Sequence, residues 1–102
     1  SVVEGLGDVE IMKLDALVFK RLDLLKLDVE GMELKALKGA SATISKCRPI
    51  IVCEVNASAL ASQGTKATVL LDYIRALNYT IENLYGGENF NDPQFDVLCK
   101  PA

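Results

Sequence analysis

The sequence predicts an α/β domain with a mostly parallel sheet, one antiparallel strand and helices packed on the sheet. Strand-like and helix-like segments alternate along the chain, which is the order that produces a parallel sheet with right-handed crossovers. No helical pattern separates the last two predicted strands, so we expect them to pair antiparallel across a loop. The predicted strands are 23–29, 50–55, 80–85 and 95–100, and the predicted helices are 32–46 and 65–77.

The segment 23–29 is the clearest strand, because the apolar run within it over 24–27 is interrupted only by Lys26. Buried strands of parallel sheets have this composition. Residues 32–46 then show apolar side chains at helical spacing, with acidic residues at the start and basic residues at the end. Both charge placements suit the helix dipole, and Pro49 stops the helix.

The second half of the chain follows the same order. Residues 50–55 form another buried apolar run, and residues 56–64 are small and predict a loop. Residues 65–77 have the apolar spacing of a helix. Asn78 is suited to the left-handed cap that ends such a helix, and Gly86 begins a polar loop between the last two strands.

A chain of 102 residues has room for one domain and not for two. We expect residues 1–22 to form a lead-in with a short strand over 9–15, and residues 23–102 to form the α/β unit. Gly5 and Gly7 do not make a phosphate-binding loop, because that loop needs a preceding strand, a third glycine and a following helix.

The composition excludes several classes of function. Eleven Lys and Arg against 14 Asp and Glu give a net charge of -3, so no basic excess favours nucleic acid or an anionic membrane. The chain has no histidine, which excludes a Ser-His-Asp triad, a Cys-His pair and a histidine-based zinc site. Catalysis would have to use carboxylates, Lys, Tyr, Cys or the positioning of reactants.

The cysteines and the apolar runs predict a cytoplasmic protein. No apolar stretch reaches the length of about 20 residues that a membrane span needs, and no signal peptide opens the chain. The cysteines are odd in number, lack the C-x-x-C spacing and are expected to be reduced packing residues. They are Cys47, Cys53 and Cys99.

Residues 25–33 carry the most specific motif in the chain, Leu-Lys-Leu-Asp-Val-Glu-Gly-Met-Glu. This stretch resembles the K-(I/L)-D-V-E-G-x-E signature of the FkbM-like family of S-adenosylmethionine-dependent methyltransferases. Other segments resemble further elements of the family in the same order, although Asn78 replaces a glycine of the family, and together they cover nearly the whole chain. These segments are Leu14-Asp15, 37–40, 48–54, 77–79 and 95–98.

The resemblance implies the C-terminal half of a Rossmann-like, class I methyltransferase fold. A complete fold begins with a D-x-G-x-x-x-G loop that holds the cofactor, and an acidic residue after the second strand holds its ribose. This sequence contains neither element. The family strand order would then give a sheet of 23–29, 50–55, 95–100 and 80–85, with strand 23–29 at an open edge.

The resemblance also implies a catalytic site of Asp28, Glu30 and Glu54 at the C-terminal ends of two neighbouring strands. One carboxylate would take the proton of an acceptor hydroxyl, or orient the acceptor, during methyl transfer. S-adenosylmethionine would be the cofactor of a complete enzyme, and a sugar or another small molecule would be the acceptor. We expect this chain alone not to bind the cofactor tightly.

Structural roles stay open for the same residues. Asp28 can cap the following helix by accepting backbone N–H bonds, and Glu30 and Glu33 can act only as charges at the helix terminus. Gly31 allows a tight strand-to-helix turn. Asp28 and Glu54 can also hold a hard cation with waters, but two or three carboxylates are too few to define a metal site.

Two functions follow from these observations. The first is methyl transfer, of the O-methyl type, with this chain as an acceptor-side fragment that is inactive alone. The second is a non-catalytic α/β module that acts by binding or assembly. In both cases the open apolar edge of strand 23–29 predicts a homodimer through this edge or through the N-terminal segment, with no nucleic acid or membrane as partner.

Overall fold

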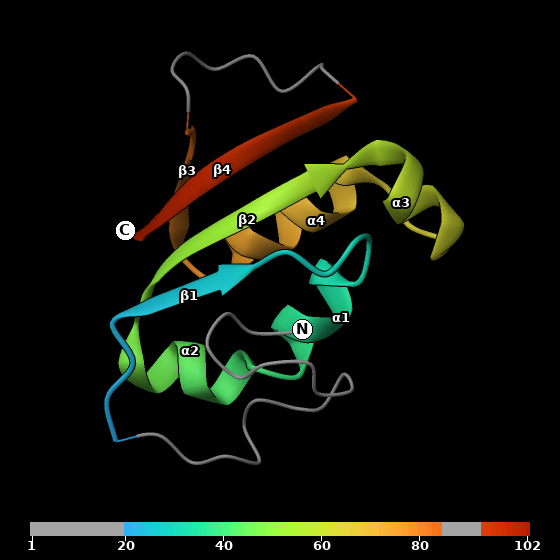
Figure 1. The fold of residues 1–102 in the computed structure, drawn as a ribbon. Coiled ribbons are helices and arrows are strands. Elements are labelled where there is room, and N and C mark those ends of the chain that lie inside the picture. Colours follow the sequence, from blue (N-terminus) through green and yellow to red (C-terminus); the bar gives the residue numbers. More distant parts are fainter. Residues whose placement is uncertain (1–19, 85–92) are drawn as a thin grey trace.

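The computed structural model describes residues 20–84 and 93–102, which form one sheet with helices packed against it (Figure 1). The predicted strand over 9–15 and the glycines at positions 5, 7 and 86 lie outside the described residues. In chain order the elements are β1 (Leu24–Leu27), α1 (Glu33–Lys38), α2 (Ser41–Cys47), β2 (Ile50–Asn56), α3 (Ala57–Ser62), α4 (Ala67–Ala76), β3 (Tyr79–Asn83) and β4 (Gln94–Pro101).

The strand order of the sheet is β1-β2-β4-β3, as predicted. β1 and β2 are parallel, whereas β4 is antiparallel to both of its neighbours. β1 is the edge strand of the described sheet, and Leu24 on it is 56% exposed. The homodimer through this edge stays a prediction.

Side chains alternate between the two faces of the sheet. On β1, Leu25 and Leu27 are buried, while Leu24 and Lys26 are exposed. The buried side chains of all four strands point to the face on which α1 and α4 pack, and α4 lies behind the sheet in Figure 1. No helix of the described residues covers the opposite face. It carries polar side chains such as Lys26 and Glu54 together with exposed apolar ones such as Leu24 and Ile50.

The single helix predicted over 32–46 is wrong, because the structure divides it into α1 and α2. The division falls at Gly39 and Ala40, where the N–H of Ala40 donates to the carbonyl of Leu37, three residues back, at 3.1 Å. Glycine is a poor helix former, so the chain tightens and turns at this point. Ala40 is buried at the turn, which joins the two short helices to one core.

The loop predicted over 56–64 is also wrong, because α3 forms most of it. The Asn56 side chain accepts a hydrogen bond from the N–H of Ala59 at 3.0 Å and caps the first turn of this helix. Leu60 is completely buried and anchors the helix to the core. The alanines of this segment also favour a helix.

The left-handed cap predicted at Asn78 is confirmed, with a φ of 65°. Arg48 ends α2 in the same conformation, with a φ of 51°, just before Pro49. Its guanidinium donates to the carbonyl oxygens of Leu77 and Asn78, each at 2.7 Å. The Leu77 carbonyl follows the last turn of α4, so the arginine satisfies it and also complements the helix dipole. The Asn78 carbonyl also accepts the N–H of Ala102 at 2.8 Å.

Tyr79 completes the connection between these two turns. The Arg48 guanidinium lies 4.5 Å from the centre of the Tyr79 ring, and the Tyr79 hydroxyl donates to the carbonyl oxygen of Pro49 at 2.6 Å. Arg48 and Tyr79 therefore connect the end of α2 to the end of α4.

We expect Arg48→Ala to lower the free energy of unfolding by about 2–3 kcal/mol, since it removes two charge-assisted hydrogen bonds. Urea unfolding followed by circular dichroism measures the change. Arg75→Ala is the matched control, because Arg75 forms only an exposed ion pair with Asp72 at 3.4 Å and should lose no more than about 0.5 kcal/mol. Equal losses of stability in the two variants would contradict the proposed connection between the ends of α2 and α4.

Candidate functional site

Asp28 and Glu54 meet where β1 and β2 end. The parallel register pairs Leu27 with Cys53, so each of the two acids follows a paired strand residue. Their carboxyl groups lie close enough together for Asp28 to raise the pKa of Glu54. Together with Lys26, they line a cavity of about 220 Å³ at this edge of the sheet. The meeting of the two acids is the arrangement that their positions at neighbouring strand ends predict.

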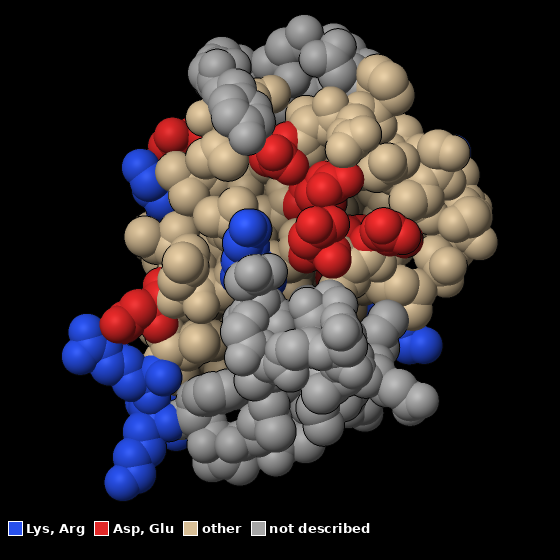
Figure 2. Space-filling model, in the orientation of Figure 1, with Lys and Arg blue, Asp and Glu red and all other residues tan. Residues whose placement is uncertain are grey.

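β4 adds two more polar residues to this pair. Asp96 lies opposite Glu54 in the antiparallel register and lines the same cavity. The Gln94 amide donates to Oε1 of Glu54 at 2.8 Å. Figure 2 shows acidic side chains gathered over the end of β2 on the open face of the sheet. We call Asp28, Glu54 and Asp96 the acidic site.

The surroundings of Glu54 raise the pKa of its carboxyl group above the ordinary value of 4.5. Partial burial is the largest cause, and the negative charge of Asp28 and its hydrogen bond come next. The charges of Asp96 and Glu33 add to the same effect. Glu54 therefore holds its proton more strongly than an isolated glutamate.

Glu30 does not join the acidic site, although the sequence groups it there. It lies exposed in the turn between β1 and α1, with a φ of 47°, and it does not line the cavity of Asp28 and Glu54. The structure thus brings together two of the three predicted site residues. The catalytic roles of all three stay predictions.

Glu33 is more than the helix-terminus charge that the sequence predicts. Its side chain is buried, at 1% exposure, and its two carboxylate oxygens accept the N–H groups of Val29 at 3.1 Å and Gly31 at 2.9 Å. Glu33 therefore holds the turn that follows Asp28. The alternative in which Asp28 caps α1 is wrong, because no side chain caps that helix.

Gly31 has the turn-forming role that the sequence predicts. Its φ is +96°, and a Cβ at this position would lie 2.3 Å from the carbonyl oxygen of Ala59. Only glycine fits this close approach of α3 to the turn. The glycine and Glu33 together fix where β1 ends, and so they fix where Asp28 stands.

Two cysteines pack in the core, as predicted. Cys53 and Cys99 are buried free thiols. Burial raises the pKa of Cys99 to about 12 and the pKa of Cys53 well above its ordinary value. Both thiols stay protonated at neutral pH, so neither serves as a thiolate nucleophile.

The described residues are 20–84 and 93–102. Within these ranges, no three or more Cys, Asp or Glu side chains are grouped so that they could hold a metal ion. In the same part of the chain, no helix has both the length and the apolar character that crossing a membrane requires.

The family of the chain is decided by a comparison with family models. The model of the methyltransferase FkbM domain matches residues 5–81, which is most of the chain. The chain belongs to the FkbM methyltransferase family. The match includes the turn held by Glu33 and both acids of the Asp28–Glu54 pair, and it ends within β3. Neither the curated proteins nor the solved structures contain a match.

We expect Glu33→Gln to lower the free energy of unfolding by about 2 kcal/mol, because the new amide group would face a buried backbone N–H donor. Urea unfolding at pH 7 measures this loss. Glu30→Gln, which changes an exposed residue of the same turn, should stay within about 0.5 kcal/mol of the native chain. No difference between the two variants would show that the buried carboxylate is replaceable.

We expect Asp28→Asn to lower the pKa of Glu54 toward 4.5, since it removes the negative charge nearest to that carboxyl group. Carbon NMR of the Glu54 carboxyl group during a pH titration measures the change. Asp96→Asn should lower the pKa less, because the charge of Asp96 contributes less. A larger effect of Asp96→Asn would contradict the pairing.

The same shift has a consequence for stability. The folded chain keeps its proton on Glu54 above pH 4.5, where an unfolded chain loses it. The stability that Glu54 contributes is therefore complete below pH 4.5 and is lost as the pH rises through the folded pKa. Asp28→Asn should make this part of the pH dependence smaller.

Proposed function

We propose that this chain is the acceptor-side part of an S-adenosylmethionine-dependent O-methyltransferase. The observation that carries the proposal is that Asp28 and Glu54 line one cavity at the carboxyl ends of two parallel strands, in a chain of the FkbM methyltransferase family. Ligands of open α/β sheets bind at this end of the strands.

The proposed task of the pair is to receive a proton. When the acceptor oxygen forms its bond to the methyl carbon, the hydroxyl proton must leave, and an ionised carboxylate within hydrogen-bond distance can take it. The raised pKa of Glu54 favours holding a proton at this end of the strands. Gln94 fixes Oε1 of Glu54, so the pair presents a defined set of acceptor atoms.

S-adenosylmethionine supplies the methyl group in this reaction, but the residues of this chain do not fit its methionine and ribose parts. The sequence has no D-x-G-x-x-x-G. In the turn after β1, the N–H groups of Val29 and Gly31 donate to Glu33, so they are not available to a ligand. We expect tight cofactor binding to require residues that these 102 do not supply.

We therefore expect calorimetric titration of the 102-residue chain with S-adenosylmethionine to give a dissociation constant no lower than about 1 mM. Binding this weak corresponds to a small binding free energy. The native chain is used, at a concentration where circular dichroism confirms that it is folded. Micromolar affinity would show that the chain holds the cofactor by itself and would overturn its assignment as an acceptor-side part.

In a complete enzyme that carries a D-x-G-x-x-x-G segment ahead of these residues, we expect Asp28→Asn to lower kcat by about 100-fold or more. The loss has this scale because position 28 would no longer carry a carboxylate that can take the proton of the acceptor hydroxyl. Asp72→Asn, an exposed change on α4, is the matched control and should keep full activity. Full activity of Asp28→Asn would favour the non-catalytic alternative.

A further inference from the structure

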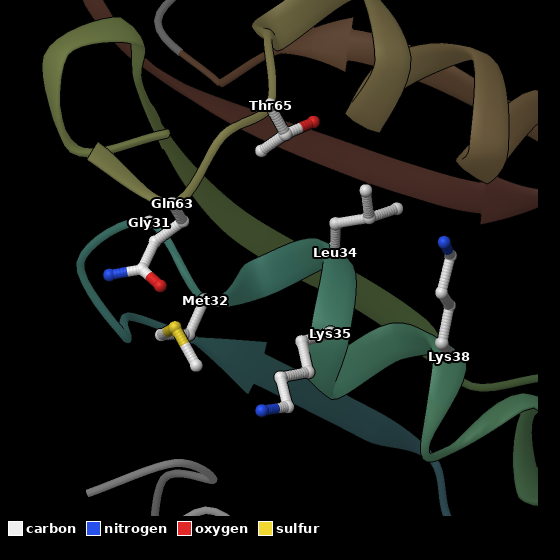
Figure 3. Close-up of a pocket in the computed structure, with 7 residues that line it drawn as sticks. All are labelled: Gly31, Met32, Leu34, Lys35, Lys38, Gln63 and Thr65. Atoms are coloured by element: carbon white, nitrogen blue, oxygen red, sulfur yellow. The ribbon is translucent and has the colours of Figure 1, made fainter. Parts of the chain in front are cut away.

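A second cavity, of about 310 Å³, lies beside the start of α1 and the connection from α3 to α4. It is separate from the acidic site, since the two share no lining residue. In Figure 3 its side chains surround a central space, with Thr65 above, Lys35 below and Lys38 on the right. Gln63 and Met32 lie on the left, and Leu34 lies between the two sides.

The charge of this cavity is positive although the chain as a whole carries -3. Lys35 and Lys38 are one helical turn apart on α1, and no Asp or Glu lines the cavity with them. Neither ammonium forms an ion pair with a described residue. The Lys38 ammonium has only the Tyr73 ring near it, at 5.9 Å from the ring centre. Two cations without a counter-charge favour an anionic ligand.

Thr65 gives an independent indication of a ligand. Its hydroxyl oxygen is buried and has no hydrogen-bond partner among the described residues. Buried hydroxyl groups in native proteins nearly always have a partner, and Thr65 is one of the residues that line the cavity. Rotation of the Thr65 side chain about χ1 would turn the hydroxyl toward the cavity, where a ligand oxygen would supply the missing acceptor.

The other residues that line the cavity indicate the chemistry of the rest of the ligand. Met32 and Leu34 are half-buried apolar side chains, and Leu34 packs against the core. A water molecule occupies about 30 Å³, so the cavity has room for roughly ten waters, which is more than an inorganic anion fills. The site therefore suits an organic molecule with one anionic group.

We propose that this cavity binds a small molecule that carries a phosphate or a carboxylate next to an apolar group. The anionic group lies on the side of the cavity that carries Lys35 and Lys38, whose ammonium groups point apart in Figure 3 and would turn toward it. The rotated Thr65 hydroxyl would donate to one of its oxygens. The apolar group lies against Met32 and Leu34. This inference does not depend on methyl transfer, because the acidic site takes no part in it.

The test uses the 102-residue chain and three probes of similar size: phenyl phosphate, benzoate and benzyl alcohol. Nitrogen–proton NMR follows the amide signals of Gly31 and Thr65 during each titration. We expect saturable shifts with at least one of the two anions, a weaker affinity at higher salt, and no saturable shift with benzyl alcohol. The comparison of phenyl phosphate with benzoate identifies the preferred anionic group. Equal binding of benzyl alcohol, or no saturable shift with either anion, would overturn the proposal.

Variants then locate the bound group. The double variant Lys35→Gln, Lys38→Gln should weaken binding of the anion by about tenfold or more, the scale of a lost charge-assisted hydrogen bond. Lys100→Gln, an exposed change on β4, is the control and should leave the affinity unchanged. Unchanged affinity in the double variant would mean that the anion binds elsewhere.

Thr65→Val separates a binding role of the hydroxyl from a structural one. Because the hydroxyl has no partner among the described residues, its removal should weaken binding without lowering Tm. A lower Tm with unchanged affinity would show that the hydroxyl serves the fold, and the proposed ligand contact would be wrong.

Discussion

The carboxylate of Glu33 is the group on which the rest of the candidate site depends. It is buried and accepts the backbone N–H groups of Val29 and Gly31, in a turn that places two successive residues in left-handed conformations. The left-handed backbone conformation is unfavourable for Glu30, and a buried carboxylate without hydrogen-bond donors is unfavourable for Glu33. The turn supplies the donors that the carboxylate needs, and the carboxylate holds the backbone in the turn. The turn then fixes the end of β1, and with it Asp28.

The sheet could be predicted from the sequence because its strands are long apolar runs. Burial on the helix-covered face explains the runs 23–29 and 50–55, and the absence of a helix before 95–100 explains the antiparallel strand. The helix boundaries depend on local hydrogen bonds instead. The turn at Gly39 and the Asn56 cap of α3 each involve one or two bonds, and periodicity does not detect them.

The site was predictable to the extent that it depends on strand ends. Asp28 and Glu54 follow paired strands, so topology alone brings them together. Glu33 was misjudged because an acid at the start of a helix usually lies in water, and the sequence does not show that α3 packs against the neighbouring Gly31. The available signal was its place two residues after Gly31, where a carboxylate can reach back to the N–H groups of a turn.

The same turn separates two sites of opposite charge. Asp28 lies before it at the acidic site, whereas Met32, Lys35 and Lys38 follow it and line the positive cavity. A defect in Glu33 should therefore disturb both sites through the backbone, while a change at Asp28 or at Lys38 disturbs one of them through charge. Parallel loss at both sites thus indicates damage to the turn, and loss at one site indicates the chemistry of that site.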